Sequence, residues 1–133
     1  MGLKIPKVMI AAVKSGSGKT TITCAFLKQL LCRKKHPVSF KCGPDYIDPM
    51  FHEQVLKIPS KNLDTFFSDA LQIQALYEME LPGHDIAVLE GVMGLYDGLG
   101  GIREEGSSYH LAKTLDVPII LVVDARGMGK SVI

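Results

Sequence analysis

Apolar positions along the chain gather in short continuous runs that alternate with longer segments of helical period. Continuous apolar runs are typical of parallel strands that are covered on both faces of a sheet. They predict strands at residues 8–13, 38–42, 85–89 and 118–124. The longer segments predict helices at residues 19–35, 49–56, 69–80 and 108–115. This alternation predicts an α/β fold in which helices flank a mostly parallel sheet.

The segment 19–35 has the clearest helical pattern. Its apolar residues recur at helical spacing and comprise Ile22, Phe26, Leu27, Leu30 and Leu31. The basic run at residues 33–35 is expected to close the last turn of this helix, where positive charge is favourable.

A glycine-rich turn, KSGSGKTT at residues 14–21, joins the first strand to the first helix. Backbone N–H groups of such a turn bind phosphate at the helix N-terminus, a lysine contacts the β- and γ-phosphates, and a hydroxyl holds Mg²⁺. The strand and the helix on either side favour this interpretation over a flexible Gly-Ser-Gly loop. The residues expected to bind a nucleotide are Ser15, Gly16, Ser17, Gly18, Lys19, Thr20 and Thr21.

The turn departs from the standard pattern GxxxxGK[ST], because Val13 stands where that pattern has glycine. Lys14 occupies the extra-lysine position of the deviant form KGGxGK[ST], which the nitrogenase iron protein and partitioning ATPases have. Two interpretations of Lys14 remain open, a contact across a dimer interface and a solvated lysine. The turn does not say what happens to the γ-phosphate, because switch proteins, pumps and ligases share it.

An acidic loop follows the second strand, in the stretch KCGPDYIDPMFH at residues 41–52. It lies at the carboxyl edge of the predicted sheet, where ligands bind in open α/β folds. Asp45 and Asp48 are three residues apart with Tyr46 between them, so their carboxylates could hold Mg²⁺ or orient a nucleophile. Alternatively, Asp48 caps a helix that begins at Pro49.

A second loop follows the third predicted strand, in LEGVMGLYDG at residues 89–98. Glu90 stands at the position of a Walker B acid and is expected to bind Mg²⁺, directly or through water. The glycines at 91, 94 and 98 are expected to let the backbone pass close to a ligand. Asp97 is expected to meet the substrate or the metal, or else to be a turn residue. Asp124 also follows a strand, but the glycine-rich sequence favours Glu90 for the metal.

The charge balance gives no sign of a polyanionic partner. Fifteen Lys and Arg against fourteen Asp and Glu give a formal net charge of +1, so no overall field favours nucleic acid or an anionic membrane. The first apolar run is also far shorter than the ~20 residues that span a bilayer. Cys24, Cys32 and Cys42 have no paired or zinc-site spacing, which indicates buried, reduced thiols in a cytoplasmic protein.

Taken together, the motifs resemble those of the cobyrinic acid a,c-diamide synthases and, more widely, of the dethiobiotin synthetase group. The segments that carry the resemblance are SGSGKTT at 15–21, KCGPDYIDPMFH at 41–52, NLDTF at 62–66 and EGVMGLYDG at 90–98. Their combination and order are more specific than a phosphate loop alone.

The resemblance implies a P-loop NTPase-like, truncated dethiobiotin synthetase-like domain that uses ATP and Mg²⁺. It implies a corrinoid tetrapyrrole as substrate, whose carboxylate takes the γ-phosphoryl group and is then opened by ammonia. Lys19 and Lys41 would offset the phosphate charge, and Thr20, Asp45 and Glu90 would hold the metal. Tyr46, Asp48 and Asp97 would face the substrate or the intermediate.

The resemblance also implies that residues 1–133 are the N-terminal part of an ATP-binding amidoligase domain. Glutamine would enter through a C-terminal glutaminase domain that is absent from this chain, so the chain alone is expected to be inactive; a homodimer is left open. Alternative substrates are hydrogenobyrinic acid and nickel sirohydrochlorin. A partitioning-type ATPase switch is a further alternative, which Lys14 favours and the loop GPDYIDP and the lack of a basic or amphipathic tail oppose.

Overall fold

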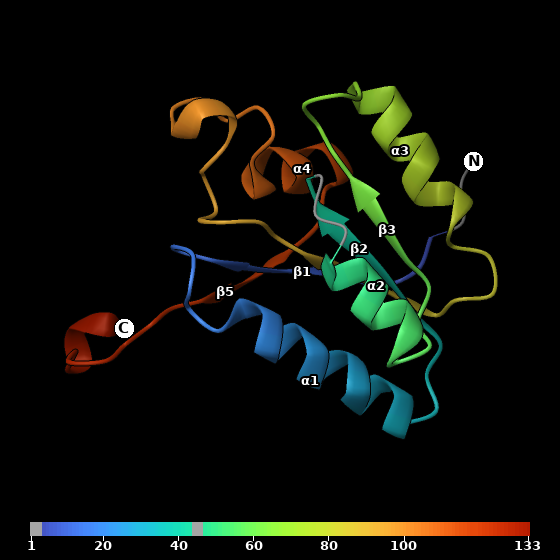
Figure 1. Cartoon of the computed structure of the whole chain (residues 1–133), viewed down its shortest axis with the longest axis horizontal. Coiled ribbons are helices and arrows are strands. Elements are labelled where there is room, and N and C mark those ends of the chain that lie inside the picture. The colour runs from blue at the N-terminus through green and yellow to red at the C-terminus, as the bar shows by residue number, and fades with distance from the viewer. Residues whose placement is uncertain (1–3, 44–46) are drawn as a thin grey trace.

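The computed structural model describes residues 4–43 and 47–133, which form a five-stranded sheet in the order β3-β2-β4-β1-β5 (Figure 1). Every pairing of neighbouring strands is parallel. The strands are β1 (Lys7–Ala12), β2 (Pro37–Cys42), β3 (Ser60–Leu63), β4 (Ile86–Glu90) and β5 (Ile119–Val122). The α/β fold predicted from the sequence is therefore confirmed.

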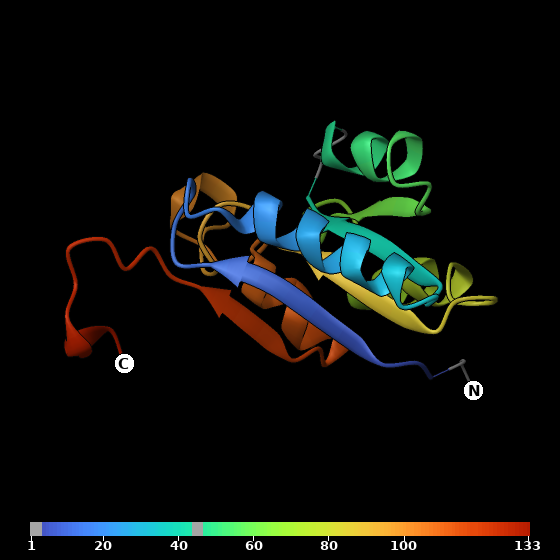
Figure 2. The same cartoon turned by 90° about the horizontal axis from the view of Figure 1, so that it is seen from below.

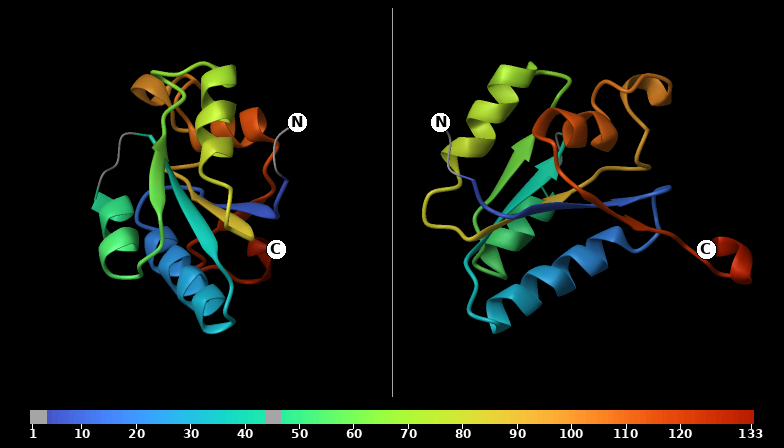
Figure 3. Two further views of the ribbon diagram at one scale, coloured as in Figure 1. Left: turned by 90° about the vertical axis from the view of Figure 1, so that its right-hand side faces the viewer. Right: turned by 180° about the vertical axis from the view of Figure 1, so that it is seen from behind.

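The helices form a layer on each face of this sheet (Figures 2 and 3). Helices α1 (Lys19–Cys32) and α2 (Ile47–Gln54) cover one face, and α3 (Ala70–Met79) and α4 (Ser108–Leu115) cover the other. Strand β1 contributes to both cores, because Met9 packs in the cluster that contains Ile73 and Leu111, whereas Ile10 packs in the cluster that contains Leu27. Burial on both faces explains the continuous apolar runs.

Strand β3 was not predicted from the sequence. Its four residues, Ser-Lys-Asn-Leu, contain one apolar side chain, because it is an edge strand that pairs with β2 alone. Ser60 and Leu63 point to opposite faces of the sheet and are both buried, while Lys61 is exposed. A short edge strand needs little apolar surface and so leaves a weak sequence signal.

Helix α1 ends three residues earlier than predicted, at Cys32, so the basic run 33–35 lies outside its last turn. Lys34 adopts a positive φ of 60°, and the backbone N–H groups of Lys34 and Lys35 donate to the carbonyls of Leu31 and Leu30. These hydrogen bonds satisfy carbonyls at the helix C-terminus. Cys32 is exposed and Cys24 is only partly buried, so the expectation that all three cysteines are buried holds for Cys42 alone.

Helix α2 begins at Ile47, so Asp48 is the second residue of the helix. The interpretation of Asp48 as the cap of a helix that begins at Pro49 is therefore wrong. In helix α3, by contrast, an aspartate is the N-cap, because Asp69 directly precedes the first helical residue. An Asp69 side-chain oxygen accepts from the Gln72 backbone N–H at 2.9 Å, and the Gln72 side chain accepts from the Asp69 N–H at 2.9 Å. This reciprocal pair satisfies two backbone donors at the helix N-terminus.

Two short 3₁₀ turns, η1 (Leu99–Gly101) and η2 (Lys130–Val132), complete the described elements. The segment after β5 runs away from the sheet (Figure 1). Strand β5 is itself an edge, and its side chains Ile120 and Leu121 are both exposed. Within residues 4–43 and 47–133, no helix is long and apolar enough to cross a membrane.

Candidate functional site

The candidate site lies where β1, β2 and β4 end. Because neighbouring strands run parallel, their carboxyl ends meet at the same edge of the sheet. Glu90, the last residue of β4, is paired in register with Ile10 of β1 on one side and with Lys41 of β2 on the other. The loops that follow these strands are the three segments in which the sequence predicted functional residues.

The phosphate loop has the conformation that its glycines allow. Gly16 and Gly18 have positive φ values of 77° and 88°, and a Cβ added to either would meet no atom within 4 Å. Ser17 closes the turn, since its hydroxyl donates to the Lys14 carbonyl at 2.9 Å. The open space beside the loop has a volume of about 240 Å³ and is lined by Gly16, Gly18, Lys19, Thr20 and Thr21.

Helix α1 begins at Lys19, so its first N–H groups lie at this loop. Exposed N–H groups at a helix N-terminus and glycines without side chains form a cradle for a phosphate group. Ser15, Thr20 and Thr21 are exposed on the same stretch. The structure therefore brings all seven predicted nucleotide-binding residues to one loop and the first turn of one helix.

Lys41 and Glu90 form a buried ion pair. The Lys41 Nζ donates to Glu90 Oε2 at 3.0 Å and to the Gly91 carbonyl at 3.1 Å. Lys41 is 2% exposed and Glu90 is 0% exposed. Burying a charge costs several kcal/mol, and the ion pair with its hydrogen bonds offsets part of that cost. Strands β2 and β4, which are paired in register at these two residues, hold the two side chains together. The sequence indicated both residues but not that they contact each other.

Charged groups converge on the thiol of Cys42, the last residue of β2. Burial raises the pKa of Cys42 to about 11, and the positive charges of Lys41 and Lys19 oppose the rise, while the negative charge of Asp64 adds to it. A thiol with so high a pKa stays protonated at neutral pH and is a poor nucleophile. Lys19, Lys41 and Asp64 are therefore near enough to Cys42 for their charges to act on its thiol.

The glycines at 91, 94 and 98 pack against the protein itself. A Cβ on Gly91 would lie 2.6 Å from Ser108 Oγ, one on Gly94 would lie 2.5 Å from the Val13 carbonyl oxygen, and one on Gly98 would lie 2.2 Å from the Arg103 carbonyl oxygen. The space that each of these glycines leaves free is therefore filled by the protein itself, and their packing is enough to explain why they are glycines. They let the loop after β4 pack onto α4, onto the start of the phosphate loop and onto itself.

Asp97 and Asp124 both support turns. Asp97 is exposed, and its Oδ2 accepts from the Gly94 backbone N–H at 2.9 Å. Asp124 accepts from the Arg126 backbone N–H at 3.1 Å and pairs with the Arg126 side chain at 2.6 Å. The hydrogen bond from the Arg126 side chain is the main cause that lowers the pKa of Asp124 to about 2. These contacts agree with the turn interpretation of both residues.

Only part of the acidic loop lies within the described residues. Asp45 and Tyr46 lie outside the described residues, and the side chain of Asp48 is not described. His52, four residues further on, is fully buried, and its Nδ1 lies 2.9 Å from Ser39 Oγ. This contact ties α2 to β2 at the base of the acidic loop.

Asp64 and the two phenylalanines after it are site residues that the sequence did not single out. They follow β3, the strand that was not predicted, and they line a pocket with Gly43 at the end of β2. The motif NLDTF at 62–66 was the available signal. Without β3, nothing in the sequence placed this motif at the same edge of the sheet as Lys41.

The donor set suits Mg²⁺ better than a transition metal. Among the described residues, no three His, Cys, Asp or Glu side chains gather as a metal site. Mg²⁺ prefers oxygen ligands, keeps several waters and binds through one or two protein groups plus substrate phosphates. The Thr20 hydroxyl and the Glu90 carboxylate fit that requirement, with Glu90 already held by Lys41.

Comparisons with known proteins agree with this geometry. The family model described as the CobQ/CobB/MinD/ParA nucleotide binding domain matches residues 8–132. Over 94% of the chain, the sequence is 48% identical to the cobyrinate a,c-diamide synthase of Gloeobacter violaceus and 43% identical to those of Methanococcus maripaludis strain C7 and Synechocystis. The matched region covers 26–28% of the length of these relatives. The resemblance seen in the motifs is thereby confirmed.

Proposed function

Because this chain belongs to the CobQ/CobB/MinD/ParA nucleotide binding domain family, we propose that the full-length protein amidates the a and c carboxylates of cobyrinate with ATP. The similarity to cobyrinate a,c-diamide synthases over nearly the whole chain is the observation that carries the proposal. The phosphate loop alone would not support the proposal, because proteins that catalyse many different reactions share such a loop.

In this proposal, the phosphate loop holds the triphosphate of ATP. The N–H groups of Gly16, Ser17 and Gly18 face the β-phosphate, and Lys19 reaches the β- and γ-phosphates. Ser15 and Thr21 extend the cradle on either side. The positive φ of Gly16 and of Gly18 supports this role, because few side-chain-bearing residues adopt that conformation.

Thr20, Glu90 and Asp45 are the residues proposed to hold Mg²⁺. Mg²⁺ bound there would neutralise phosphate charge while phosphoryl transfer takes place. Lys41 keeps Glu90 oriented through the 3.0 Å ion pair and adds positive charge at the end of β2. Charge neutralisation matters because the attacking carboxylate and the phosphate are both anions.

The substrate carboxylate attacks the γ-phosphorus through one of its oxygens, and the bond from phosphorus to the bridging oxygen of ADP breaks. Ammonia then adds to the acyl carbon of the resulting acyl phosphate, loses a proton, and inorganic phosphate leaves with the carboxylate-derived oxygen. Tyr46 and Asp48 are proposed to face the substrate or this intermediate. Asp97 is exposed, and it is proposed to face them too while its Oδ2 keeps the hydrogen bond from the Gly94 N–H. A carboxylate needs this activation because its own oxygen is a poor leaving group.

Glutamine is the proposed source of the ammonia, and a further domain of the full-length protein is proposed to release it. The proposed site of action is the cytoplasm, where ATP and reduced thiols are found together. Neither nucleic acid nor a membrane is a proposed partner, whereas a homodimer is compatible with the exposed Lys14.

The proposal is tested by mass spectrometry of the products that the full-length protein forms from cobyrinate, ATP, Mg²⁺ and ammonium. The expected product is the diamide, formed only when ATP is present. Hydrogenobyrinic acid and nickel sirohydrochlorin serve as parallel substrates, and preference for either would correct the substrate assignment. ATP hydrolysis that DNA or lipid stimulates, with no amide formed from any tetrapyrrole, would instead support a partitioning-type switch.

A further inference from the structure

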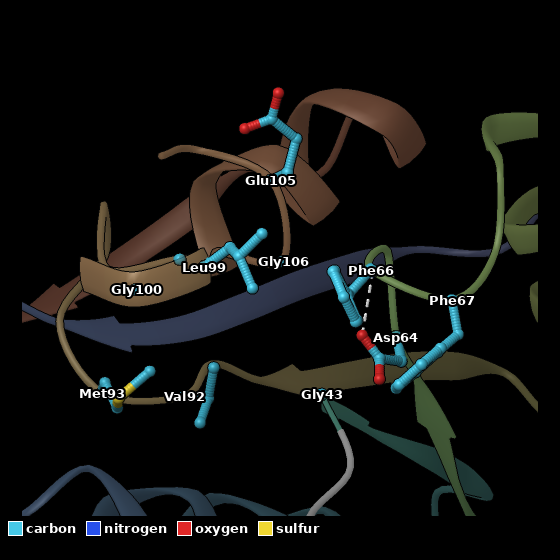
Figure 4. Close-up of a pocket in the computed structure, with 11 residues that line it drawn as sticks. Gly43, Asp64, Phe66, Phe67, Val92, Met93, Leu99, Gly100, Glu105 and Gly106 are labelled. Atoms are coloured by element: carbon cyan, nitrogen blue, oxygen red, sulfur yellow. Dashed lines mark hydrogen bonds between the residues drawn. The ribbon is translucent and has the colours of Figure 1, made fainter. Parts of the chain in front are cut away.

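A pocket of about 250 Å³ opens near the carboxyl ends of β2 and β4 (Figure 4). Its walls come from the loops after β2, β3 and β4, so it lies at the same edge of the sheet as the phosphate loop. Gly43 stands two residues after Lys41, and Val92 stands two residues after Glu90. The pocket therefore lies close along the chain to both residues of the ion pair, although neither of them lines it.

The lining is mainly apolar, and much of it is uncovered. Phe66, Phe67, Met93 and Leu99 are 49%, 75%, 44% and 43% exposed. Figure 4 shows the two phenylalanines on one side of the pocket and Met93 and Leu99 on the other. Fully burying one such side chain stabilises a protein by about 1.5–3 kcal/mol. A contiguous group of apolar side chains that stays exposed near the candidate site therefore indicates a surface that binds a ligand.

Backbone hydrogen bonds hold this pocket in shape. The Phe66 N–H donates to Asp64 Oδ1 at 2.9 Å, which fixes the turn that presents both phenylalanines. The Gly106 N–H donates to the buried Thr65 Oγ1 at 3.0 Å and so joins the loop after β3 to the loop before α4. The Leu99 N–H donates to the Glu105 carbonyl at 2.9 Å. The two walls are therefore fixed to each other before any ligand binds.

Charge restricts what this pocket accepts. Of the described residues that line it, none is basic, and Asp64 and Glu105 are acidic. Figure 4 shows the Glu105 side chain pointing away from the other lining side chains, whereas Asp64 lies between Gly43 and the phenylalanines. A carboxylate of a ligand would be repelled by Asp64 and attracted to Lys19 at the phosphate loop. The pocket thus favours the apolar part of a ligand whose carboxylate reaches the phosphate loop.

We infer that Phe66, Phe67, Met93 and Leu99 bind an edge of the corrin macrocycle of cobyrinate and orient one rim carboxylate toward the phosphate loop. This inference rests on the proposed function and adds the surface that binds the substrate. The corrin ring is a conjugated, methyl-bearing macrocycle with carboxylate arms at its rim, so it has an apolar edge and anionic arms. The ring is larger than the pocket, and an edge therefore enters while the rest stays outside.

The test is equilibrium binding of cobyrinate to the full-length protein, followed by the visible absorbance of the corrin. Phe67→Ala should raise the Kd for cobyrinate about tenfold, which corresponds to about 1.4 kcal/mol. The Kd for ATP should be unchanged. The rate of amidation at cobyrinate concentrations below the Kd should fall by a similar factor, because less of the protein then holds the substrate.

Leu71→Ala is the matched control, because Leu71 is 78% exposed on α3 and does not line the pocket. Leu99→Ala, on the opposite wall, should raise the Kd for cobyrinate in the same direction as Phe67→Ala. If wild-type protein forms the amide while Phe67→Ala and Leu99→Ala bind cobyrinate as tightly as Leu71→Ala does, this inference is wrong and the proposed function stands.

Two further outcomes would also overturn the inference. If wild-type protein neither binds cobyrinate nor amidates it, the proposed function fails and the inference fails with it. If Phe67→Ala lowers the molecular mass in solution but leaves the Kd for cobyrinate unchanged, a second copy of the chain covers the pocket instead of the macrocycle.

Discussion

At the scale of single residues, the Lys41–Glu90 pair contributes both to stability and to the proposed chemistry. Both side chains are buried, and their charges lie 3.0 Å apart. A buried pair gains little over two well-packed apolar side chains, but the loss of one partner leaves an uncompensated charge. Stability and activity should therefore respond differently to single and double substitutions.

Lys41→Met and Glu90→Leu should each lower the free energy of unfolding by about 3 kcal/mol, because each leaves one buried charge unpaired. The double variant should be more stable than either single variant. All three should lose amidation, since the proposed site needs both charges. Urea denaturation and the product assay measure the two effects. A double variant whose destabilisation equals the sum of the single effects, or one that still forms amide, would contradict these roles.

The cysteines should differ in reactivity because their surroundings differ. Cys32 is exposed, whereas burial raises the pKa of Cys42 to about 11. A raised pKa keeps the thiol protonated, so at about pH 8 little of the reactive thiolate is present at Cys42. Iodoacetamide should therefore label Cys32 first and leave Cys42 intact in folded protein. Peptide mass spectrometry checks this order, and equal labelling of both residues would show that the end of β2 is open to solvent.

At the scale of elements, the loop after β4 supports the start of the phosphate loop. The Leu95 N–H donates to the Ala12 carbonyl at 2.8 Å, and Gly94 packs against Val13. The two loops contact each other although they are far apart in the sequence. A substitution in one loop should therefore alter the conformation of the other loop.

Gly94→Ala should weaken nucleotide binding, because its Cβ would lie 2.5 Å from the Val13 carbonyl oxygen and the backbone there must move. Forcing a methyl group into a packed site costs about 1–3 kcal/mol, and we expect the Kd for ATP to rise about tenfold. Gly129→Ala is the control, since a Cβ there would meet nothing within 4 Å. Isothermal titration with ATP compares the two variants, and equal affinities would show that the contact does not shape the phosphate loop.

Four of the five strands could be predicted from the sequence because burial on both faces produces continuous apolar runs. Strand β3 could not, because an edge strand with the sequence Ser-Lys-Asn-Leu has little apolar surface to reveal it. The phosphate loop could be predicted because its chemistry is local. The Lys41–Glu90 contact could not, because β2 and β4 are neighbours only in the folded sheet. The pocket at Phe66 was missed for the same reason, since it depends on β3.

At the scale of the whole molecule, β5 leaves one edge of the sheet open. Ile120 and Leu121 point to opposite faces of that strand, and both are exposed. An exposed apolar edge strand is a template for pairing with another chain. The chain is therefore expected to associate in solution through this edge when nothing else covers it.

Leu121→Lys should reduce this association, because a charged residue on an edge strand opposes pairing. Light scattering during gel filtration of the 133-residue chain measures the effect as a fall in mass at equal concentration. Leu76→Lys, at an exposed position on α3, is the control and should leave the mass unchanged. A wild-type chain that is monomeric at every concentration would contradict the role given to β5.

In the proposed reaction, the triphosphate and a substrate carboxylate react with each other at the carboxyl edge of this sheet. Cobyrinate labelled with ¹⁸O in its carboxylates tests it most directly, with the full-length protein, ATP, Mg²⁺ and ammonium, by mass spectrometry of the inorganic phosphate released. We expect one ¹⁸O atom in the phosphate for each amide formed, because the acyl phosphate passes its carboxylate oxygen to the phosphate. Phosphate that carries no ¹⁸O while amide accumulates would contradict the account.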